Sequence, residues 1–469
     1  MPSDDPFDNI LLLSDSYKVS HWVQYPPKTE FVYSYFESRG GQFPHVLFFG
    51  LQYIVKRYLQ GVVVTAEKIS QAEAFFKLHF GSAKNFNKAG WEYILNVHDG
   101  QLPISIKAVA EGTIVPTHNV LLTCVNTDPN CYWLTNFIET ILVQVWYPST
   151  VATNSYAQKK LIQEWMKKTG IFDRESLVFK LHDFGFRGVS SVESSAIGGL
   201  AHLVNFRGTD TMSALICGSE FYSEPCAGYS IPASEHSTIT SWGKDHEVDA
   251  FRNMLIQYPD GLVACVSDSW DVFNAAENFW ASDLRDLIMA RDGRLVIRPD
   301  SGDPPSVVVK VLELLAGDPQ KGFGPFLTTT STGHKLLPRQ IRVIQGDAID
   351  YDMIEKIYSA MHSAGWAADN VGFGSGGALL QKMNRDTLKF AFKCSSVTID
   401  GREVDVYKDP VTDPGKRSKK GRLALVHEQG EWQTVQHDPD ISDQLVEIFR
   451  NGELLVEYSL SDIRNRASL

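Results

Sequence analysis

The sequence has few cysteines and no excess of basic residues. Six cysteines occur among 469 residues, no two of them have C-x-x-C spacing, and no Cys/His group has the spacing of a zinc site. So few thiols in so long a chain argue against a disulfide scaffold and favour a reducing, cytoplasmic location. The net charge of −12 argues against a whole-molecule nucleic-acid binder, which needs a basic face.

Several signals of targeting and catalysis are also missing. The N-terminal segment begins with acidic residues and carries only four consecutive aliphatic residues, Ile10–Leu13, so it does not predict a signal peptide. No run approaches ~18 apolar residues, and we expect no membrane span. The absence of G-x-S-x-G, H-E-x-x-H and Walker patterns argues against hydrolase and zinc-protease functions.

What is present is the composition of a globular protein of two to four domains, with 43% hydrophobic and 21% charged residues. We expect an N-terminal α+β domain over residues 1–170, with a half-buried strand at 31–38 and helices at 47–61 and 131–147. Residues 386–469 predict a β-rich C-terminal segment.

Residues 171–385 repeat one pattern, in which an aliphatic run is followed by a polar cluster and a helical stretch. Uninterrupted apolar runs are typical of strands covered on both faces, as in parallel sheets. About six such units favour a β/α barrel, with a doubly wound open sheet as the alternative. Barrel enzymes place their chemistry where the strands end, although any single acid there could be a helix N-cap. The acids at these strand ends are Asp183, Asp210, Asp268, Asp300 and Asp347.

Two strand ends predict an anion or sugar-phosphate site. The glycine-rich turn before the helix at 377–382 lets the backbone amides of Gly376 and Gly377 approach a phosphate, and Arg385 could reach the same anion. Arg298 and Asp300 have alternate-residue spacing and can face one pocket. An ion pair at the rim of the sheet is the structural alternative for this second pair.

Two further motifs carry side chains suited to ligand binding. H-D-F-G-F-R-G places Phe184 and Arg187 on a glycine-flanked turn, where an aromatic ring could stack on a planar ligand or pack in the core. His236, in a loop, could be a general base, a phosphoryl acceptor or a structural residue. Taken alone, its structural role is favoured.

Ten stretches, in order along nearly the whole chain, match one known family. They include SDSYKVSHWVQYPP at 14–27, KLHDFGFRGVSS at 180–191, HLVNFRGTDT at 202–211 and FGSGGALLQK at 373–382. On these motifs the chain closely resembles the nicotinamide phosphoribosyltransferases, which are type II phosphoribosyltransferases. The resemblance implies an α/β fold, with an irregular β/α barrel flanked by an α+β domain built from both chain termini.

The resemblance also implies roles for individual residues. The nicotinamide ring would lie between Phe184 and a Tyr17 of the partner subunit in a homodimer, with Asp210 and Arg298 at its amide. His236 would be phosphorylated by ATP beside Asp268, and Asp300 would lie at the ribose. Mg²⁺ would accompany the pyrophosphate, and the resemblance assigns no protein ligand to it. The residues implied for the phosphoribosyl and pyrophosphate groups are Arg39, Arg187, Gly346, Asp347, Gly376, Gly377, Arg385, Lys393, Lys408 and Lys416.

The implied activity transfers phosphoribosyl from phosphoribosyl pyrophosphate to nicotinamide, in NAD salvage. An ionised Asp210 accepts a hydrogen bond from an amide but repels the carboxylate of nicotinate, so we expect nicotinamide to be preferred. The alternatives are a nicotinate phosphoribosyltransferase and a non-catalytic binding or signalling protein on the same scaffold. We interpret the basic loop at 416–422 as closing on a phosphate, with nucleic-acid binding as its alternative. We expect neither a nucleic-acid nor a membrane partner.

Overall fold

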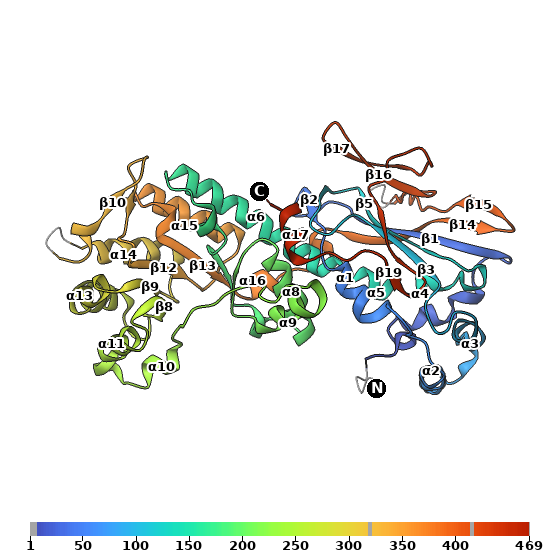
Figure 1. Cartoon of the computed structure of the whole chain (residues 1–469), viewed down its shortest axis with the longest axis horizontal. Coiled ribbons are helices and arrows are strands. Elements are labelled where there is room, and N and C mark those ends of the chain that lie inside the picture. The colour runs from blue at the N-terminus through green and yellow to red at the C-terminus, as the bar shows by residue number, and fades with distance from the viewer. Residues whose placement is uncertain (1–6, 318–320, 413–416, 469) are drawn as a thin grey trace. The chain divides into compact units, whose positions relative to one another are not determined.

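The computed structural model describes residues 7–317, 321–412 and 417–468, so Lys416 lies outside the described residues. The chain forms two compact units. The first runs through Thr153 and also contains Glu220–Glu224 and Asn384–Ser468, and the second consists of Asn154–Ser219 and Pro225–Met383 (Figure 1). The first unit is therefore built from both ends of the chain.

A seven-stranded sheet forms the centre of the first unit. Its strand order is β15-β14-β1-β5-β3-β18-β19, and all neighbouring strands are antiparallel. β1 pairs with β14 on one side and β5 on the other, so segments from the two ends of the chain share one sheet. The strands, in sheet order, are Arg402–Asp405, Phe390–Ile399, Thr29–Ser38, Val120–Asn126, Ile104–Ala108, Val446–Arg450 and Glu453–Leu454.

The prediction of a half-buried strand at 31–38 is right about the strand and wrong about its burial. Every residue from Val32 to Ser38 is buried, because both faces of β1 are covered in the middle of the sheet. Two smaller ladders complete the strands of this unit. They are β2 (His45–Leu47) with β4 (Ile114–Pro116), and β16 (Leu423–Glu428) with β17 (Glu431–Gln436).

The single helix expected at 131–147 is also wrong, because the structure divides this segment. α4 (Leu134–Phe137) and α5 (Glu139–Val143) are separated at Ile138, and neither has a side-chain N-cap. α6 (Trp146–Lys168) begins further on. An uncapped segment that is apolar on most sides takes its helix limits from tertiary packing rather than from local signals. The other helices of the first unit are η1 (Ile10–Leu12), η2 (Ser16–Val23), α1 (Leu51–Ile54), η3 (Val55–Leu59), α2 (Ala66–His79), η4 (Ala83–Asn85), α3 (Lys88–Val97), η5 (Pro129–Cys131), α4 (Leu134–Phe137), α5 (Glu139–Val143), η11 (Arg385–Thr387) and α17 (Leu460–Arg466).

Besides one short antiparallel pair, β10 (Thr328–Thr329) with β11 (Lys335–Leu336), the second unit contains a central sheet of six strands that are all parallel, in the order β7-β6-β13-β12-β9-β8. Their aliphatic side chains fill a core in which Val263, Leu295 and Val343 are fully buried. This curled, half-barrel sheet confirms the expected irregular β/α barrel (Figure 1). The strands, in chain order, are β6 (Leu181–Asp183), β7 (Gly208–Thr209), β8 (Asp260–Val266), β9 (Asp292–Arg298), β12 (Ile341–Gln345) and β13 (Val371–Ser375).

The strand order distinguishes a barrel from an open doubly wound sheet. The last strand, β13, pairs with the first, β6, so the strands follow one another cyclically, with one opening between β7 and β8. The extended segment 229–234 spans that opening. Its Tyr229 forms a parallel bridge with Gly208 of β7, and Ala233 forms one with Ala264 of β8. This irregular seventh segment connects the two edges of the sheet.

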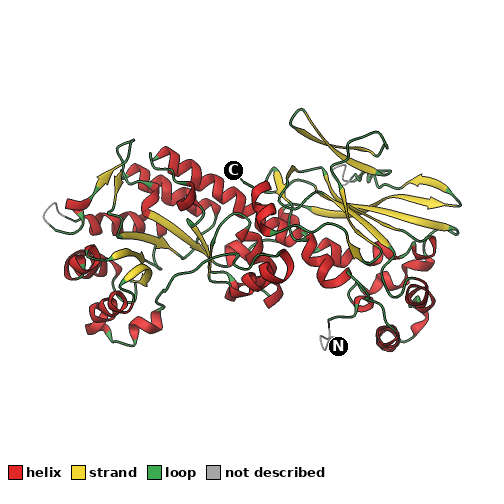
Figure 2. Cartoon of the chain, in the orientation of Figure 1, coloured by secondary structure: helices red, strands yellow, loops and turns green. Residues whose placement is uncertain are grey.

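Helices alternate with these strands (Figure 2). The helices expected near 306–317 and 352–365 are present as α14 (Pro304–Ala316) and α15 (Tyr351–Ser363). α14 starts where Asp303 accepts a hydrogen bond from the Ser306 amide at 3.2 Å, with proline in its first turn. No helix within the described residues has the length and hydrophobicity needed to cross a membrane. The other helices are α7 (Arg174–Leu177), η6 (Phe186–Gly188), α8 (Val192–Leu203), α9 (Met212–Tyr222), α10 (His236–Thr240), η7 (Lys244–His246), α11 (Glu247–Gln257), α12 (Val272–Asn274), η8 (Ala275–Asp283), α13 (Arg285–Met289), η9 (Gly324–Phe326), η10 (Ala368–Asn370) and α16 (Gly377–Leu380).

Candidate active site

A cavity of about 1000 Å³ opens at the carboxyl ends of the parallel strands in the second unit. Its walls come from the segments that follow β6, β7, β9, β12 and β13, because parallel strands deliver all their carboxyl ends to one edge. The structure therefore brings together residues that lie far apart in the sequence. The expected site residues in its lining are Phe184, Arg187, Asp210, His236, Arg298, Asp300, Gly346, Gly376 and Gly377.

Phe184 lies in the wall of the cavity, directly after β6. Its backbone N–H donates to the Ser375 carbonyl at 2.9 Å, which fixes the chain at this point. A Cβ added at Gly374 would lie 1.9 Å from Cε2 of the Phe184 ring. The ring therefore occupies space that only a glycine in β13 leaves free, and it is half-buried rather than enclosed in the core.

Asp210 follows β7 and is held by two neighbours. His182 Nε2 lies 2.8 Å from its Oδ1, and the Ser230 hydroxyl donates to the same oxygen. Burial alone would raise the pKa of Asp210, but the hydrogen bond and charge of His182, the Ser230 hydroxyl and the Arg298 guanidinium lower it below its usual value. Both hydrogen bonds fall on Oδ1 of Asp210, which leaves its Oδ2 for a ligand.

Arg298 and Asp300 face the same cavity from the end of β9. Arg298 Nε lies 3.7 Å from Asp300 Oδ1, too long for a hydrogen bond, and this buried Nε has no hydrogen-bond partner within the described residues. Burial is the main cause that raises the pKa of Asp300, and the negative charges of Asp268 and Asp347 raise it further. The nearby Arg298 and His236 act in the opposite direction and lower it. Neither Asp268 nor Asp347 is part of the cavity lining, yet both act electrostatically on a carboxylate that is.

His236 is the first residue of α10, where the capping box of Glu235 orients the start of the helix. Its Nε2 lies 2.9 Å from Asp268 Oδ1, with the imidazole 49% exposed and the carboxylate 7% exposed. A buried acid thus holds one nitrogen of an accessible histidine. This is the arrangement of an oriented nucleophile or proton carrier.

The glycine turn after β13 presents backbone to the cavity. A Cβ added at Gly377 would meet nothing within 4 Å, and one at Gly376 would have only the Phe184 carbonyl at 3.6 Å. Packing inside the protein therefore does not explain why side chains are missing here. The open space leaves the backbone amides of this turn accessible to a ligand. Arg187, exposed in η6, lines the same cavity.

The remaining expected residues belong to the first unit. Tyr17 lies in η2 with 61% of its surface exposed. Lys393, in β14, has its pKa lowered by burial and then by the nearby cations Arg39, Lys408 and Arg385, against the opposing charge of Glu139. These four cations form a cluster, defined here as Arg39, Arg385, Lys393 and Lys408.

Sequence reasoning missed two residues at the Asp210 carboxylate, namely His182 and Ser230. His182 could have been found, because it alternates with Phe184 on a strand and i, i+2 residues point to one side. Ser230 lies on the irregular segment that spans the gap in the barrel, and no local sequence pattern predicts its position beside Asp210.

Comparison with known proteins agrees with this architecture. The computed fold is similar to the crystal structure of nicotinate-nucleotide pyrophosphorylase from Pyrococcus furiosus, with a TM-score of 0.62 at 15% identity over 99% of this chain and 96% of that one. It is also similar to human nicotinic acid phosphoribosyltransferase, with a TM-score of 0.58 at 17% identity over 97% and 93%. At these identities the likeness establishes the fold alone.

The family models narrow the class. The model of the nicotinate phosphoribosyltransferase (NAPRTase) family matches residues 179–453, and that of the nicotinamide phosphoribosyltransferase N-terminal domain matches residues 9–106. Fold and family models together define a pyridine phosphoribosyltransferase.

Sequence relatives identify the family within that class. A nicotinamide phosphoribosyltransferase of Xanthomonas campestris pv. campestris (strain 8004) is 49% identical over 98% of both chains. One of Acinetobacter baylyi is 32% identical over 98% of this chain and 97% of its own. The chain belongs to the nicotinamide phosphoribosyltransferase family, as the sequence motifs predicted.

Proposed function

We propose that this enzyme transfers the phosphoribosyl group of phosphoribosyl pyrophosphate to nicotinamide, giving nicotinamide mononucleotide and pyrophosphate in NAD salvage. The observation that carries the proposal is the Asp210 carboxylate in the cavity wall. Its pKa is lowered, chiefly by His182 acting against burial, so it is ionised at neutral pH. An ionised carboxylate accepts a hydrogen bond from a carboxamide N–H and repels a carboxylate ligand.

The pyridine ring would stack on Phe184, the half-buried aromatic side chain in the cavity wall. Stacking fixes the plane of the ring, and the amide on Asp210 fixes its rotation within that plane, so the ring nitrogen faces one direction. We assign the second face of the ring to Tyr17 of a partner subunit in a cytoplasmic homodimer. The 61% exposure of Tyr17 in the single chain leaves its ring available for that role.

Phosphoribosyl pyrophosphate would bind by its anionic ends. The open amides of Gly376 and Gly377, together with Arg385, suit the 5′-phosphate, and the charges of Arg39, Arg187, Lys393 and Lys408 suit the pyrophosphate. Asp300 and Gly346 line the cavity for the ribose.

The acidic residues near the ribose fit Mg²⁺. The pKa of Asp300 is raised by burial, and the charges of Asp268 and Asp347 contribute to the rise. Carboxylates that repel one another are the oxygen donors that a divalent cation stabilises. Asp347 would hold Mg²⁺, which when bound shields the negative charge of the pyrophosphate, and Asp300 would stay free to face the ribose.

The transfer breaks the C1–O bond to pyrophosphate and forms a bond from the pyridine nitrogen to C1. Positive charge develops on the ribose as the C–O bond lengthens, and the Asp300 carboxylate stabilises it. The positive charges of Arg39, Arg187, Lys393 and Lys408 stabilise the negative charge on the leaving group. No covalent bond to the enzyme is needed, so positioning of the two substrates supplies much of the acceleration.

We further propose that ATP phosphorylates His236. With Nε2 hydrogen-bonded to Asp268, Nδ1 keeps its lone pair and can attack the terminal phosphorus of ATP, forming an N–P bond as ADP leaves. Asp268 stabilises the positive charge that the imidazole then carries. The phosphorylated side chain would stand at the edge of the cavity that it lines.

The test measures kcat/KM for nicotinamide and for nicotinate with wild type, Asp210→Asn and Ser230→Ala. We expect wild type to prefer nicotinamide by at least about 100-fold, which corresponds to about 2.7 kcal/mol. Asp210→Asn removes the charge at constant shape and should bring the preference within about tenfold. Ser230→Ala removes one donor to Asp210, keeps the charge, and should keep the preference.

Two results would contradict the proposal. Comparable turnover of the two substrates by wild type would favour a nicotinate phosphoribosyltransferase. No nucleotide product from either substrate, with or without ATP, would favour a non-catalytic protein on the same scaffold.

A further inference from the structure

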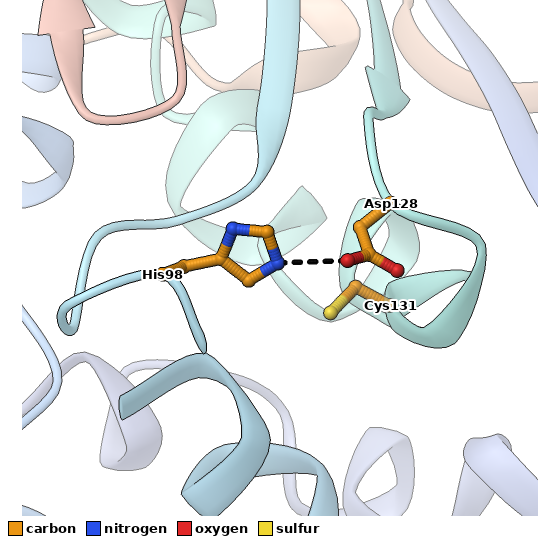
Figure 3. Close-up of side chains that lie close together, drawn as sticks. All are labelled: His98, Asp128 and Cys131. Atoms are coloured by element: carbon orange, nitrogen blue, oxygen red, sulfur yellow. Dashed lines mark hydrogen bonds and ion pairs between the residues drawn. The ribbon is translucent and has the colours of Figure 1, made fainter. Parts of the chain in front are cut away.

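His98, Asp128 and Cys131 come together in the first unit, in a cluster that the proposed reaction does not use (Figure 3). His98 immediately follows α3, where its backbone N–H caps the helix by donating to the Ile94 carbonyl. Asp128 caps the start of η5, and Cys131 is the last residue of that short helix. Because Asp128 and Cys131 are three residues apart on one turn, their side chains can face the same ligand.

The donor atoms of the three residues lie close together. One imidazole nitrogen, one carboxylate oxygen and the sulfur are all within 4.8 Å of one another, and His98 Nε2 is 2.9 Å from Asp128 Oδ2. The ligand atoms of a tetrahedral zinc site lie about 3.3–3.8 Å apart, given Zn–N and Zn–O bonds near 2.0 Å and Zn–S bonds near 2.3 Å. Small side-chain movements would convert the observed arrangement into a tetrahedral metal site. They lengthen the contact between His98 Nε2 and Asp128 Oδ2 and bring the Cys131 sulfur closer to both atoms.

The Cys131 thiol is available for coordination. It is a free cysteine and is buried, so its sulfur is not committed to a disulfide. The His98 and Asp128 side chains are 23% and 15% exposed, so the site can be reached from solvent on their side. The Tyr93 hydroxyl donates to Asp128 Oδ2 at 3.1 Å and orients the carboxylate.

We propose that His98, Asp128 and Cys131 bind one divalent transition-metal ion of the zinc class, with water in the fourth position. A thiolate and an imidazole select a borderline metal such as Zn²⁺ over Mg²⁺ or Ca²⁺, which prefer oxygen ligands. On binding, the S–H bond of Cys131 releases its proton to solvent, the sulfur forms a bond to the metal, and no oxidation occurs. His98 exchanges its contact with Asp128 for a bond to the ion.

Bound metal would link the end of α3 to the turn after β5. These segments are 30 residues apart at His98 and Asp128, which is why no zinc-type spacing exists in the sequence. The site belongs to the first unit alone and is independent of the cavity chemistry. Its failure would therefore leave the proposed phosphoribosyl transfer unaffected.

The experiment uses the full-length enzyme, reduced and freed of metal by a chelator that is then removed. Zn²⁺ is titrated by calorimetry, and Co²⁺ is added as a spectroscopic probe whose thiolate bond gives a charge-transfer absorption in the near ultraviolet. We expect about one equivalent of metal per chain and a cobalt–thiolate band. Saturating Zn²⁺ should raise the melting temperature, because the ion binds the folded state.

The variants His98→Gln and Cys131→Ser should each weaken Zn²⁺ binding by at least about 10–100-fold, the loss that even outer-shell substitutions cause. Cys131→Ser should also abolish the cobalt–thiolate band. The matched control is Cys226→Ser, since Cys226 is an exposed cysteine of the second unit; it should keep the stoichiometry and the band. Melting curves without metal establish that each variant is folded.

Three results would overturn the proposal. The first is no binding of Zn²⁺ by the reduced wild type at micromolar concentrations. The second is a cobalt–thiolate band that survives Cys131→Ser and disappears in Cys226→Ser. The third is full-affinity binding by a folded His98→Gln protein.

Discussion

Replacing Gly374 by alanine tests the packing that holds Phe184 in the cavity wall. The added Cβ would lie 1.9 Å from Cε2 and 2.2 Å from Cδ2 of the Phe184 ring, far inside van der Waals contact. The φ angle of Gly374 is not in the left-handed region, so the backbone tolerates an alanine here. The clash must therefore be relieved by movement of the Phe184 ring. Overpacking of this kind costs about 1–3 kcal/mol of folding stability.

The functional consequence follows from the displaced ring. Stacking of an aromatic side chain on a planar base contributes about 1–3 kcal/mol, so losing one face of the stack should raise KM for nicotinamide by about 5–150-fold. Labelling of His236 by ATP should continue, because its contact with Asp268 does not involve Phe184. The assays are steady-state kinetics at saturating phosphoribosyl pyrophosphate and phosphohistidine labelling.

Gly372→Ala is the matched control for this variant. It makes the same substitution two residues earlier on β13, where the added Cβ would meet only the Lys180 carbonyl at 3.8 Å, an ordinary contact. Its KM for nicotinamide should match that of wild type. An unchanged KM in a folded Gly374→Ala protein, or equal increases in both variants, would refute the role of Phe184 as the stacking ring.

Three further predictions concern other parts of the molecule. His236→Gln should abolish ATP stimulation and phosphohistidine labelling while basal product formation persists; undiminished stimulation would rule out this phosphorylation site. Asp369→Asn should lower the free energy of unfolding by about 3–5 kcal/mol in urea titrations, because Lys180 and Arg342, at 2.8 and 3.1 Å from the carboxylate, lose their buried partner. The pKa of Asp369, which burial would raise, is lowered to about 2 by those two cations, so its contribution is present above about pH 4 and is lost as the pH falls towards 2; a flat acid limb of stability would contradict this. Tyr17→Ala should raise KM for nicotinamide, and mixing it with a Phe184→Ala protein should restore one intact site per mixed dimer, whereas no recovery would argue against a shared site.

Much of the barrel follows from the sequence. Aliphatic runs without alternation predicted parallel strands, and the acids Asp210, Asp268, Asp300 and Asp347 lie within two residues of the ends of β7, β8, β9 and β12. Asp183 is the exception, because its buried carboxylate accepts a hydrogen bond from the Gly185 amide at 2.7 Å and supports the turn. Local pattern cannot separate an acid that supports a turn from one that faces a ligand, since both follow a strand.

The closure of the barrel could not be predicted from local signals. Residues 229–234 carry no long apolar run, and they are held between β7 and β8 by isolated bridges rather than by a ladder. The position of Ser230 beside Asp210 follows from that non-local pairing. The division of 131–147 into short helices was missed for the same reason, because packing rather than capping sets where they end.

Individual site residues could be predicted from the sequence to different degrees. Gly376 and Gly377 could be proposed as a phosphate cradle from glycine content and the helix that follows. Only the structure shows that, among the residues it describes, no atom lies within 4 Å of a Cβ added at Gly377. The hydrogen bonds that His182 and Ser230 make to Asp210 bring together three separate segments of the chain. No spacing rule in the sequence connects these segments.

The most direct test of the account is a crystal structure of the enzyme with nicotinamide bound. We expect the pyridine ring to stack on Phe184 and the carboxamide nitrogen to lie within hydrogen-bond distance, about 2.7–3.2 Å, of Asp210 Oδ2. A ring bound elsewhere in the cavity, or an amide that does not contact Asp210, would contradict it.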